Sequence, residues 1–142
     1  NYYKKKSKII IDYAHTPDAL KKILKSLTFN NKKPNLVFGC GGNRDKHKRK
    51  QMGIIANNYA AKVYITDDNP RYENPLLIRK NILKYCPNAY EIPDRKKAII
   101  KAVKDIKKNE ILIVAGKGHE KIQIIKNKEL KFDDFQIVKK II

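Results

Sequence analysis

The sequence has few cysteines and no long apolar run, and each absence excludes a class of protein. Its 142 residues include only two cysteines, which is too few for a disulfide framework and fits a reducing compartment. No apolar run approaches the ~18 residues of a membrane span, and the first residues do not resemble a signal peptide. The three histidines and two cysteines show no metal-ligand spacing. We therefore expect a cytoplasmic domain with no membrane partner and no metal site of its own.

Arginine is also scarce, although the chain is strongly basic. The net charge is +19, with 33 Lys and Arg against 14 Asp and Glu, but only five of those 33 residues are arginine. The lysines are spread along the chain, and Ile and Asn are frequent too, which is typical of an AT-biased genome. The charge is either a solvated basic surface or a surface that attracts anions, including nucleic acid. Because arginines that read bases are too few, we expect no nucleic acid partner.

The two common nucleotide-binding fingerprints are missing as well. Neither GxGxxG nor GxxxxGK[ST] occurs in the chain. No base is arranged beside Cys40, so this cysteine is expected to be structural rather than nucleophilic. The chain has the length of one domain and 42% hydrophobic residues, enough for a core. It begins at Asn1 rather than Met, and we expect a domain cut from a longer protein.

What is present is a regular alternation of short apolar segments and amphipathic segments. The segments with strand character are 8–13, 35–39, 62–66, 89–92 and 111–116. The segments with helical spacing are 17–27, 52–59, 76–85, 98–106 and 133–142. This alternation predicts an α/β fold with a mostly parallel sheet and helices on both faces.

The carboxyl-terminal part breaks this alternation. The apolar segment 121–125 follows the strand 111–116 too closely for a helical crossover, so we expect an antiparallel hairpin there. A turn at 127–128 then leads into a last short strand, 129–132. The hairpin is expected to make the sheet mixed.

Unusual polar residues follow four of the predicted strands. They occupy the segments 12–18, 39–48, 66–71 and 116–120. In open α/β sheets, ligands bind at the carboxyl ends of the strands. We therefore expect the four segments to form one site.

The segment TDDNPR at 66–71 is the most informative of the four. The Asp68 carboxylate can accept hydrogen bonds from an ammonium group, and the Arg71 guanidinium is a planar fork that matches a carboxylate. Pro70 stiffens the turn between them. A turn that carries both an acid and an arginine suits a zwitterion, and therefore an amino acid. The alternative is an exposed turn with a surface ion pair.

Each of the other three segments has a functional and a structural interpretation. In the glycine-rich loop 39–49, Arg44 and Lys46 could hold a carboxylate or phosphate, or the loop could be a flexible turn with solvated charges. Asp12 could accept a ribose hydroxyl and His15 could reach a phosphate or a ring, or both could only tie their turn together. The segment 116–120 could equally be the start of a hairpin.

Four motifs, in this order, resemble the carboxyl-terminal domain of the Mur ligase family. They are DYAHTPDAL, FGCGGNRDK, TDDNPR and VAGKGHE, and the resemblance covers residues 8–142. It implies a Rossmann-like domain that presents an incoming amino acid. It also implies two further domains, absent from this chain, that hold a UDP-sugar substrate and ATP with Mg²⁺. In such enzymes ATP phosphorylates the carboxylate of UDP-MurNAc-L-Ala-D-Glu, and an amine then attacks the acyl phosphate to form an amide.

The resemblance also assigns roles to individual positions. Matching the family's amino-acid pocket are Arg44, Asp68, Asn69, Pro70, Arg71, Gly116 and Glu120. Asp12 and His15 match positions that face the nucleotide, and no catalytic or metal-binding residue is implied. The chain departs from the family at His47, where a small residue is expected, and at Asn43, where an acid is common.

The motif DNPR indicates which amino acid is added. The resemblance associates it with meso-diaminopimelate rather than L-lysine. Diaminopimelate carries a second carboxylate at its far end, which an arginine fork recognises and which lysine lacks. Two alternatives remain: a domain of a lysine-adding or other Mur ligase, and a free-standing basic module that binds nucleic acid. Without the other domains, the chain is expected to be inactive.

Overall fold

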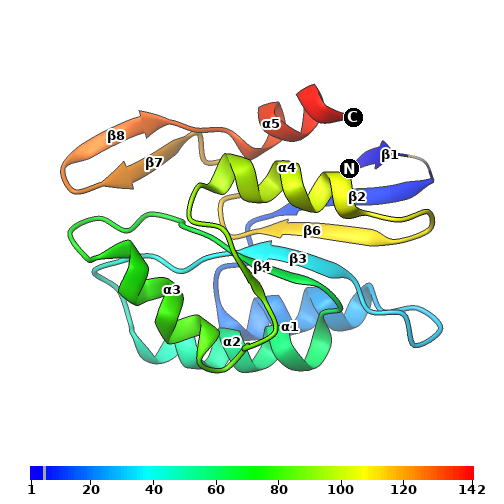
Figure 1. The fold of residues 1–142 in the computed structure, drawn as a ribbon, viewed down its shortest axis with the longest axis horizontal. Helices are drawn as coiled ribbons and strands as arrows, with labels where there is room; N and C mark the ends of the chain where they lie inside the picture. Colours follow the sequence, from blue (N-terminus) through cyan, green and yellow to red (C-terminus); the bar gives the residue numbers. More distant parts are fainter. Residues whose placement is uncertain (5) are drawn as a thin grey trace.

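A buried sheet lies between two layers of helices in the computed structural model, which describes residues 1–4 and 6–142 (Figure 1). The strands are β1 (Tyr2–Lys4), β2 (Ser7–Asp12), β3 (Asn35–Phe38), β4 (Val63–Ile65), β5 (Tyr90–Glu91), β6 (Ile111–Ala115), β7 (Ile122–Ile125) and β8 (Lys128–Lys131). The helices are α1 (Pro17–Ser26), α2 (His47–Tyr59), α3 (Pro75–Leu83), α4 (Arg95–Asp105) and α5 (Asp134–Ile141).

The main sheet is mostly parallel, as the alternation of segments predicts. Its strand order is β1-β2-β6-β3-β4-β5, and every neighbouring pair from β2 onward is parallel. Only β1 at the edge runs antiparallel, against β2. Sequence patterns missed β1 because its three residues, YYK, form no apolar run.

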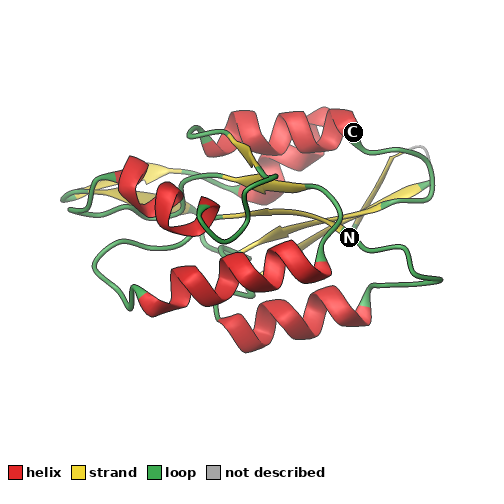
Figure 2. Ribbon diagram, turned by 60° about the horizontal axis from the view of Figure 1, so that its bottom comes forward, coloured by secondary structure: helices red, strands yellow, loops and turns green. Residues whose placement is uncertain are grey.

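Alternate side chains of the central strands enter two separate cores. Leu36 and Phe38 of β3 pack against α1, α2 and α3, whereas Val37 between them packs against α4 and α5. Figure 1 shows α4 and α5 on one side of the strands and α1, α2 and α3 on the other, and Figure 2 shows helices on both sides of the sheet from a second direction. Because both faces are covered, β3 and β4 are buried at every position, which explains why they read as continuous apolar runs.

The helix starts follow local rules that are visible in the sequence. Thr16 caps α1, where its Oγ1 accepts a hydrogen bond from the Ala19 N–H at 3.3 Å, and Pro17 follows at the first helical position. Asp94 caps α4 and Asp133 caps α5 in the same way. These caps fix where each loop ends and each helix begins.

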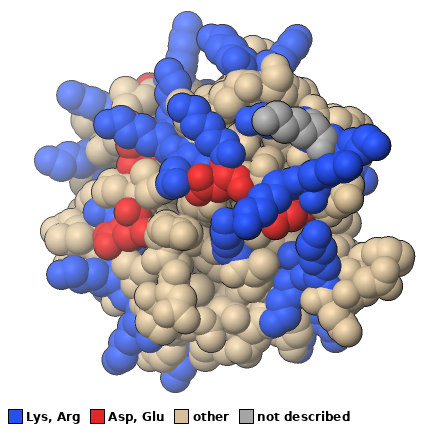
Figure 3. Space-filling view, turned by 45° about the vertical axis from the view of Figure 1, so that its right-hand side comes forward, with Lys and Arg blue, Asp and Glu red and all other residues tan. Residues whose placement is uncertain are grey.

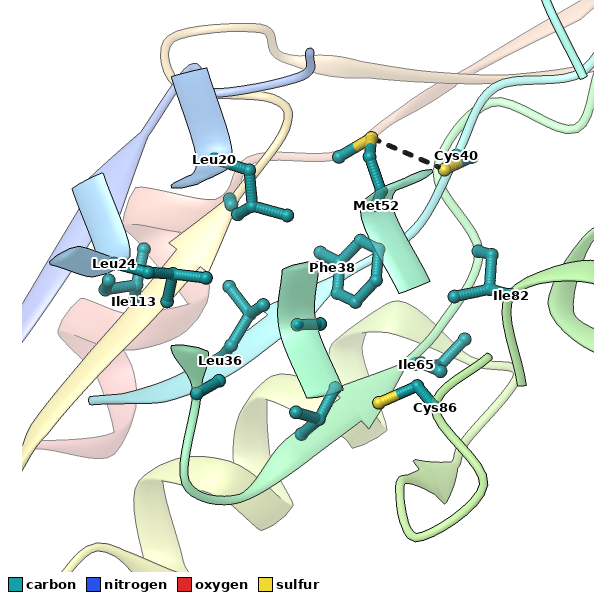
Figure 4. Close-up of a cluster of buried hydrophobic side chains, with 14 of the residues drawn as sticks. Leu20, Leu24, Leu36, Phe38, Cys40, Met52, Ile65, Ile82, Cys86 and Ile113 are labelled. Atoms are coloured by element: carbon teal, nitrogen blue, oxygen red, sulfur yellow. Dashed lines mark hydrogen bonds between the residues drawn. The ribbon is translucent and has the colours of Figure 1, made fainter. Parts of the chain in front are cut away.

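Both cysteines are free, and both belong to the core between the sheet and the helices α1, α2 and α3. The Cys40 thiol lies 3.8 Å from the Met52 sulfur (Figure 4). Burial raises the pKa of Cys40 to about 12. A thiol that is buried and held neutral in this way fits the structural role expected for it.

The predicted carboxyl-terminal hairpin is present, but its strands differ from the expected pair. β7 pairs antiparallel with β8 in a separate two-stranded sheet, whereas β6 pairs with β2 and β3. The expectation that 111–116 and 121–125 form the hairpin is therefore wrong. The short segment between them contains the loop Gly116–Glu120, which carries β7 away from the main sheet.

Candidate functional site

The four polar loops meet at one edge of the sheet. β2, β6, β3 and β4 are neighbours and run parallel, so the loops that follow them emerge side by side. They surround a cavity of about 510 Å³. It is lined by Tyr13, His15, Thr16, Gly41, Arg44, Asp45, Lys48, Asp68, Asn69, Arg71, Gly116 and Glu120. The prediction that the four segments lie together is confirmed.

The structure brings most of the predicted site residues to this cavity. Of the residues expected to bind the amino acid, all except Pro70 line it, and His15 lines it too. Asp12 does not: its Oδ1 accepts a hydrogen bond from the Ala14 N–H at 2.8 Å. Asp12 therefore ties its own turn together, which is the structural interpretation of that motif.

Arg71 is held at both its backbone and its side chain. It adopts a left-handed backbone with φ of 52°. Its N–H donates to the Ile124 carbonyl at 3.1 Å, and its carbonyl accepts from the Lys126 N–H at 2.6 Å. Its Nη1 donates to the Gly42 carbonyl at 3.0 Å. Among the described residues, the side-chain hydrogen bonds of Arg71 all come from Nη1, so its Nε and Nη2 donors have no protein acceptor there.

Glu73 braces the loop that carries Arg44 against the turn that carries Arg71. Its two carboxylate oxygens accept from the Asn43 N–H and from Arg49 Nη2, each at 2.8 Å. Burial opposes ionisation of Glu73, but these hydrogen bonds hold its pKa below the ordinary value. The loop and the turn therefore form one rigid wall of the cavity.

Asn43 also explains why one departure from the family pattern is tolerated. Its Oδ1 accepts a hydrogen bond from the Tyr72 N–H at 3.0 Å. An aspartate at this position offers the same acceptor. The second departure, His47, is the first residue of α2 and does not line the cavity.

A buried lysine lies beneath the acidic side of the cavity. Lys117 has no exposed surface, and its Nζ lies 3.1 Å from Asp68 Oδ1 and 2.8 Å from Asn69 Oδ1. Asn69 Oδ1 also accepts from the Ile124 N–H at 2.9 Å. Asn69 therefore joins the turn after β4 to β7. Sequence reasoning missed Lys117 and Glu73, because their partners lie far away in the chain.

The cavity combines both signs of charge. Arg44, Lys48 and Arg71 supply cations, and Asp68 and Glu120 are among its acids. The Glu120 carboxylate raises the pKa of Tyr13, whose ring lies 4.4 Å from that of His15. Such a lining suits a ligand that carries both ammonium and carboxylate groups.

Neither a metal centre nor a membrane span is found in the part of the chain that the structure describes. Residues 1–4 and 6–142 contain no group of three or more His, Cys, Asp and Glu side chains that could hold a metal ion. No helix among them is long and apolar enough to cross a membrane. On the face drawn in Figure 3, Lys and Arg are scattered among acidic and neutral residues rather than gathered into one stripe.

Comparison with known proteins gives consistent similarities. The model of the family "Mur ligase, glutamate ligase domain" matches residues 2–118. The chain is 54% identical, over 94% of its length, to UDP-N-acetylmuramoyl-L-alanyl-D-glutamate--2,6-diaminopimelate ligase of Anaplasma marginale. It is 51% identical, over 96% of its length, to the protein of that name from Buchnera aphidicola. The chain spans 29% and 28% of the lengths of these two relatives.

A solved structure shows the same similarity in three dimensions. The structure of a UDP-N-acetylmuramoyl-L-alanyl-D-glutamate--2,6-diaminopimelate ligase superposes with a TM-score of 0.90 at 37% identity. The match covers 98% of this chain and 30% of that one. The predicted α/β fold and the predicted family are confirmed by these findings.

Proposed function

Because this chain belongs to the Mur ligase family, we propose that it is the amino-acid-binding domain of a 2,6-diaminopimelate ligase. In this proposal residues 1–142 form the carboxyl-terminal domain of a three-domain enzyme of peptidoglycan synthesis. The enzyme joins meso-diaminopimelate to UDP-MurNAc-L-Ala-D-Glu through an amide bond. The observation that carries the proposal is the cavity at the carboxyl edge of the sheet, whose lining contains both arginine and carboxylate side chains.

Different residues of the site bind different charged groups of the amino acid. The free part of the Arg71 guanidinium takes the far carboxylate of diaminopimelate, with Arg44 nearby as a second cation. Asp68 and Glu120 accept from an ammonium group, and Gly116 and Asn69 complete the wall. The role of this domain is to hold the attacking amine in place, which lowers the entropic cost of the reaction.

ATP and Mg²⁺ are proposed to bind mainly outside this chain. The described residues include no group of His, Cys, Asp and Glu side chains that could hold a metal ion. ATP supplies the phosphoryl group that activates the acceptor carboxylate, and the amine of diaminopimelate displaces it as phosphate. His15 lines the cavity on the strand-to-helix turn that Asp12 stabilises, which supports the proposal that it faces the nucleotide when the domains close.

The test of this function is Arg71→Ala in the complete gene product that contains the chain, assayed with diaminopimelate. Losing a charge-assisted carboxylate contact is expected to lower kcat/KM for diaminopimelate by roughly 100-fold. Preference over lysine is expected to fall with it. Lys46→Ala is the control, because Lys46 is exposed and does not line the cavity.

The same assay separates the alternatives. If Arg71→Ala left both diaminopimelate turnover and lysine discrimination intact, the assignment of the pocket would be wrong. A lysine-adding ligase would turn over lysine in preference to diaminopimelate. A nucleic-acid-binding module would instead bind DNA or RNA of any sequence with an affinity that falls steeply as salt is raised.

A further inference from the structure

Lys117 is a charged residue buried beneath the amino-acid site. Its side chain is fully buried, an arrangement that is costly unless the ammonium group is fully paired. Its Nζ donates to Asn69 Oδ1 at 2.8 Å and to the Ile122 carbonyl at 3.0 Å, and it lies 3.1 Å from Asp68 Oδ1. The Glu120 carboxylate lies further away, at 3.9 Å. Lys117 therefore joins the turn after β4, the loop after β6 and the start of β7.

We propose that Lys117 is a positioning and specificity-determining residue of this site. It fixes the Asp68 carboxylate for the substrate ammonium, and its charge disfavours an amino acid with a cationic far end, such as lysine. The inference rests on the proposed function and adds a residue to it. Lys117 does not line the cavity, so it acts on the substrate through Asp68 and Glu120.

The two oxygens of Asp68 have different surroundings, which supports the positioning role. Oδ1 is paired with Lys117, so the carboxylate cannot rotate freely. Oδ2 faces Gly116, where an added Cβ would come within 3.0 Å of it. Gly116 lines the cavity and has φ of 110°, a conformation that favours glycine. Lys117 thus holds one oxygen, and the glycine keeps the approach to the other oxygen open.

The charge balance of the site supports the specificity role. The cavity lining contains three carboxylates, of Asp45, Asp68 and Glu120, and three cationic side chains, of Arg44, Lys48 and Arg71. Lys117 adds a buried fourth cation within 4 Å of two of those carboxylates. The far end of diaminopimelate carries an ammonium and a carboxylate, whereas that of lysine carries only an ammonium. A site with an excess of positive charge therefore favours diaminopimelate.

The test is Lys117→Met in the complete gene product, compared with Lys121→Met. Methionine fills the slot without a charge, whereas Lys121 is exposed and serves as the control. We expect KM for diaminopimelate to rise at least 10-fold, with a smaller change in kcat and an unchanged KM for ATP. We also expect the ratio of kcat/KM for lysine to that for diaminopimelate to rise by about 10-fold, whereas Lys121→Met leaves both values as in the wild type.

A double-mutant cycle separates this role from a purely structural one. If Lys117 acts through Asp68, the KM of Lys117→Met/Asp68→Asn equals that of the worse single variant, rather than the product of the two effects. An unchanged ratio of lysine to diaminopimelate, together with multiplied KM effects, would overturn the inference. If Lys117→Met does not fold, Lys117→Gln gives the same comparison with a neutral side chain that retains hydrogen bonding. Wild-type turnover of diaminopimelate tests the proposed function by itself, so the two failures are distinguishable.

Discussion

Two adjacent glycines in the loop after β3 face different kinds of neighbour. A Cβ added at Gly41 would come within 2.8 Å of Arg71 Nη1, the end of a flexible side chain. A Cβ added at Gly42 would collide with the backbone carbonyl of Pro70. The first contact is relieved by moving the guanidinium, whereas the second requires a shift of the main chain.

We therefore predict that one alanine substitution mainly affects substrate binding and the other mainly affects stability. Gly41→Ala is expected to displace the Arg71 guanidinium and raise KM for diaminopimelate several-fold, while stability changes by less than about 1 kcal/mol. Gly42→Ala is expected to destabilise the fold by about 2 kcal/mol or more, because the wall of the cavity is overpacked. Urea unfolding and steady-state kinetics of both variants check this. Equal stability losses in the two variants would contradict it.

Sequence reasoning identified the residues that lie in motifs but not the residues that hold them. Arg44, Asp68 and Arg71 stand at predicted strand ends, and their chemistry is visible from their type. Lys117 became recognisable only when the fold brought it to Asn69, 48 positions away. Residue type alone predicts a possible ligand role for Asp12, because it does not reveal that the partner of this carboxylate is a backbone group, the Ala14 N–H.

At the scale of elements, one buried ion pair holds the last helix in place. Arg95 begins α4 and Asp134 begins α5, and neither side chain is exposed. Arg95 Nη2 donates to Asp134 Oδ2 at 2.7 Å and to the carbonyl of Ala115, the last residue of β6, at 3.1 Å. The pair thus fixes α5 against the end of the strand that leads into the site.

Breaking this pair is expected to be costly. Asp134→Ala leaves a buried guanidinium without its partner and should lower the free energy of unfolding by about 3–5 kcal/mol. Asp133→Ala removes only the cap of α5 and should cost about 1 kcal/mol. Guanidinium chloride unfolding of both variants measures the difference. Similar losses would mean that the buried pair contributes no more than a cap.

Helices and strands could be predicted where the pattern of apolar residues within the segment itself decides the structure. Each of the five helices overlaps the segment predicted for it, although α2 begins at His47 rather than near residue 52, because no side-chain cap marks its start. The partner of β7 could not be assigned from spacing alone, because closeness in sequence favoured β6. The structure pairs β7 with β8, since β6 already has neighbours on both sides.

At the scale of the whole molecule, the positive charge destabilises the folded state. A net charge of +19 on 142 residues repels itself in the folded state, and added salt screens that repulsion. We predict that raising NaCl from about 0.05 to about 0.5 M stabilises the chain by roughly 1 kcal/mol, which corresponds to a rise in Tm of about 3 °C. Thermal unfolding followed by circular dichroism measures it, and a constant or falling Tm would contradict the prediction.

The pairing of Arg71 with β7 has a consequence for exchanging parts between relatives. Arg71 forms a single parallel bridge with Ile125, and Asn69 accepts a hydrogen bond from β7. The turn after β4 and the β7–β8 hairpin therefore form a matched pair of segments. A chimaera that takes the turn from one ligase and the hairpin from another separates two matched halves. Specificity is therefore best transplanted with both segments together, although they lie far apart in the chain.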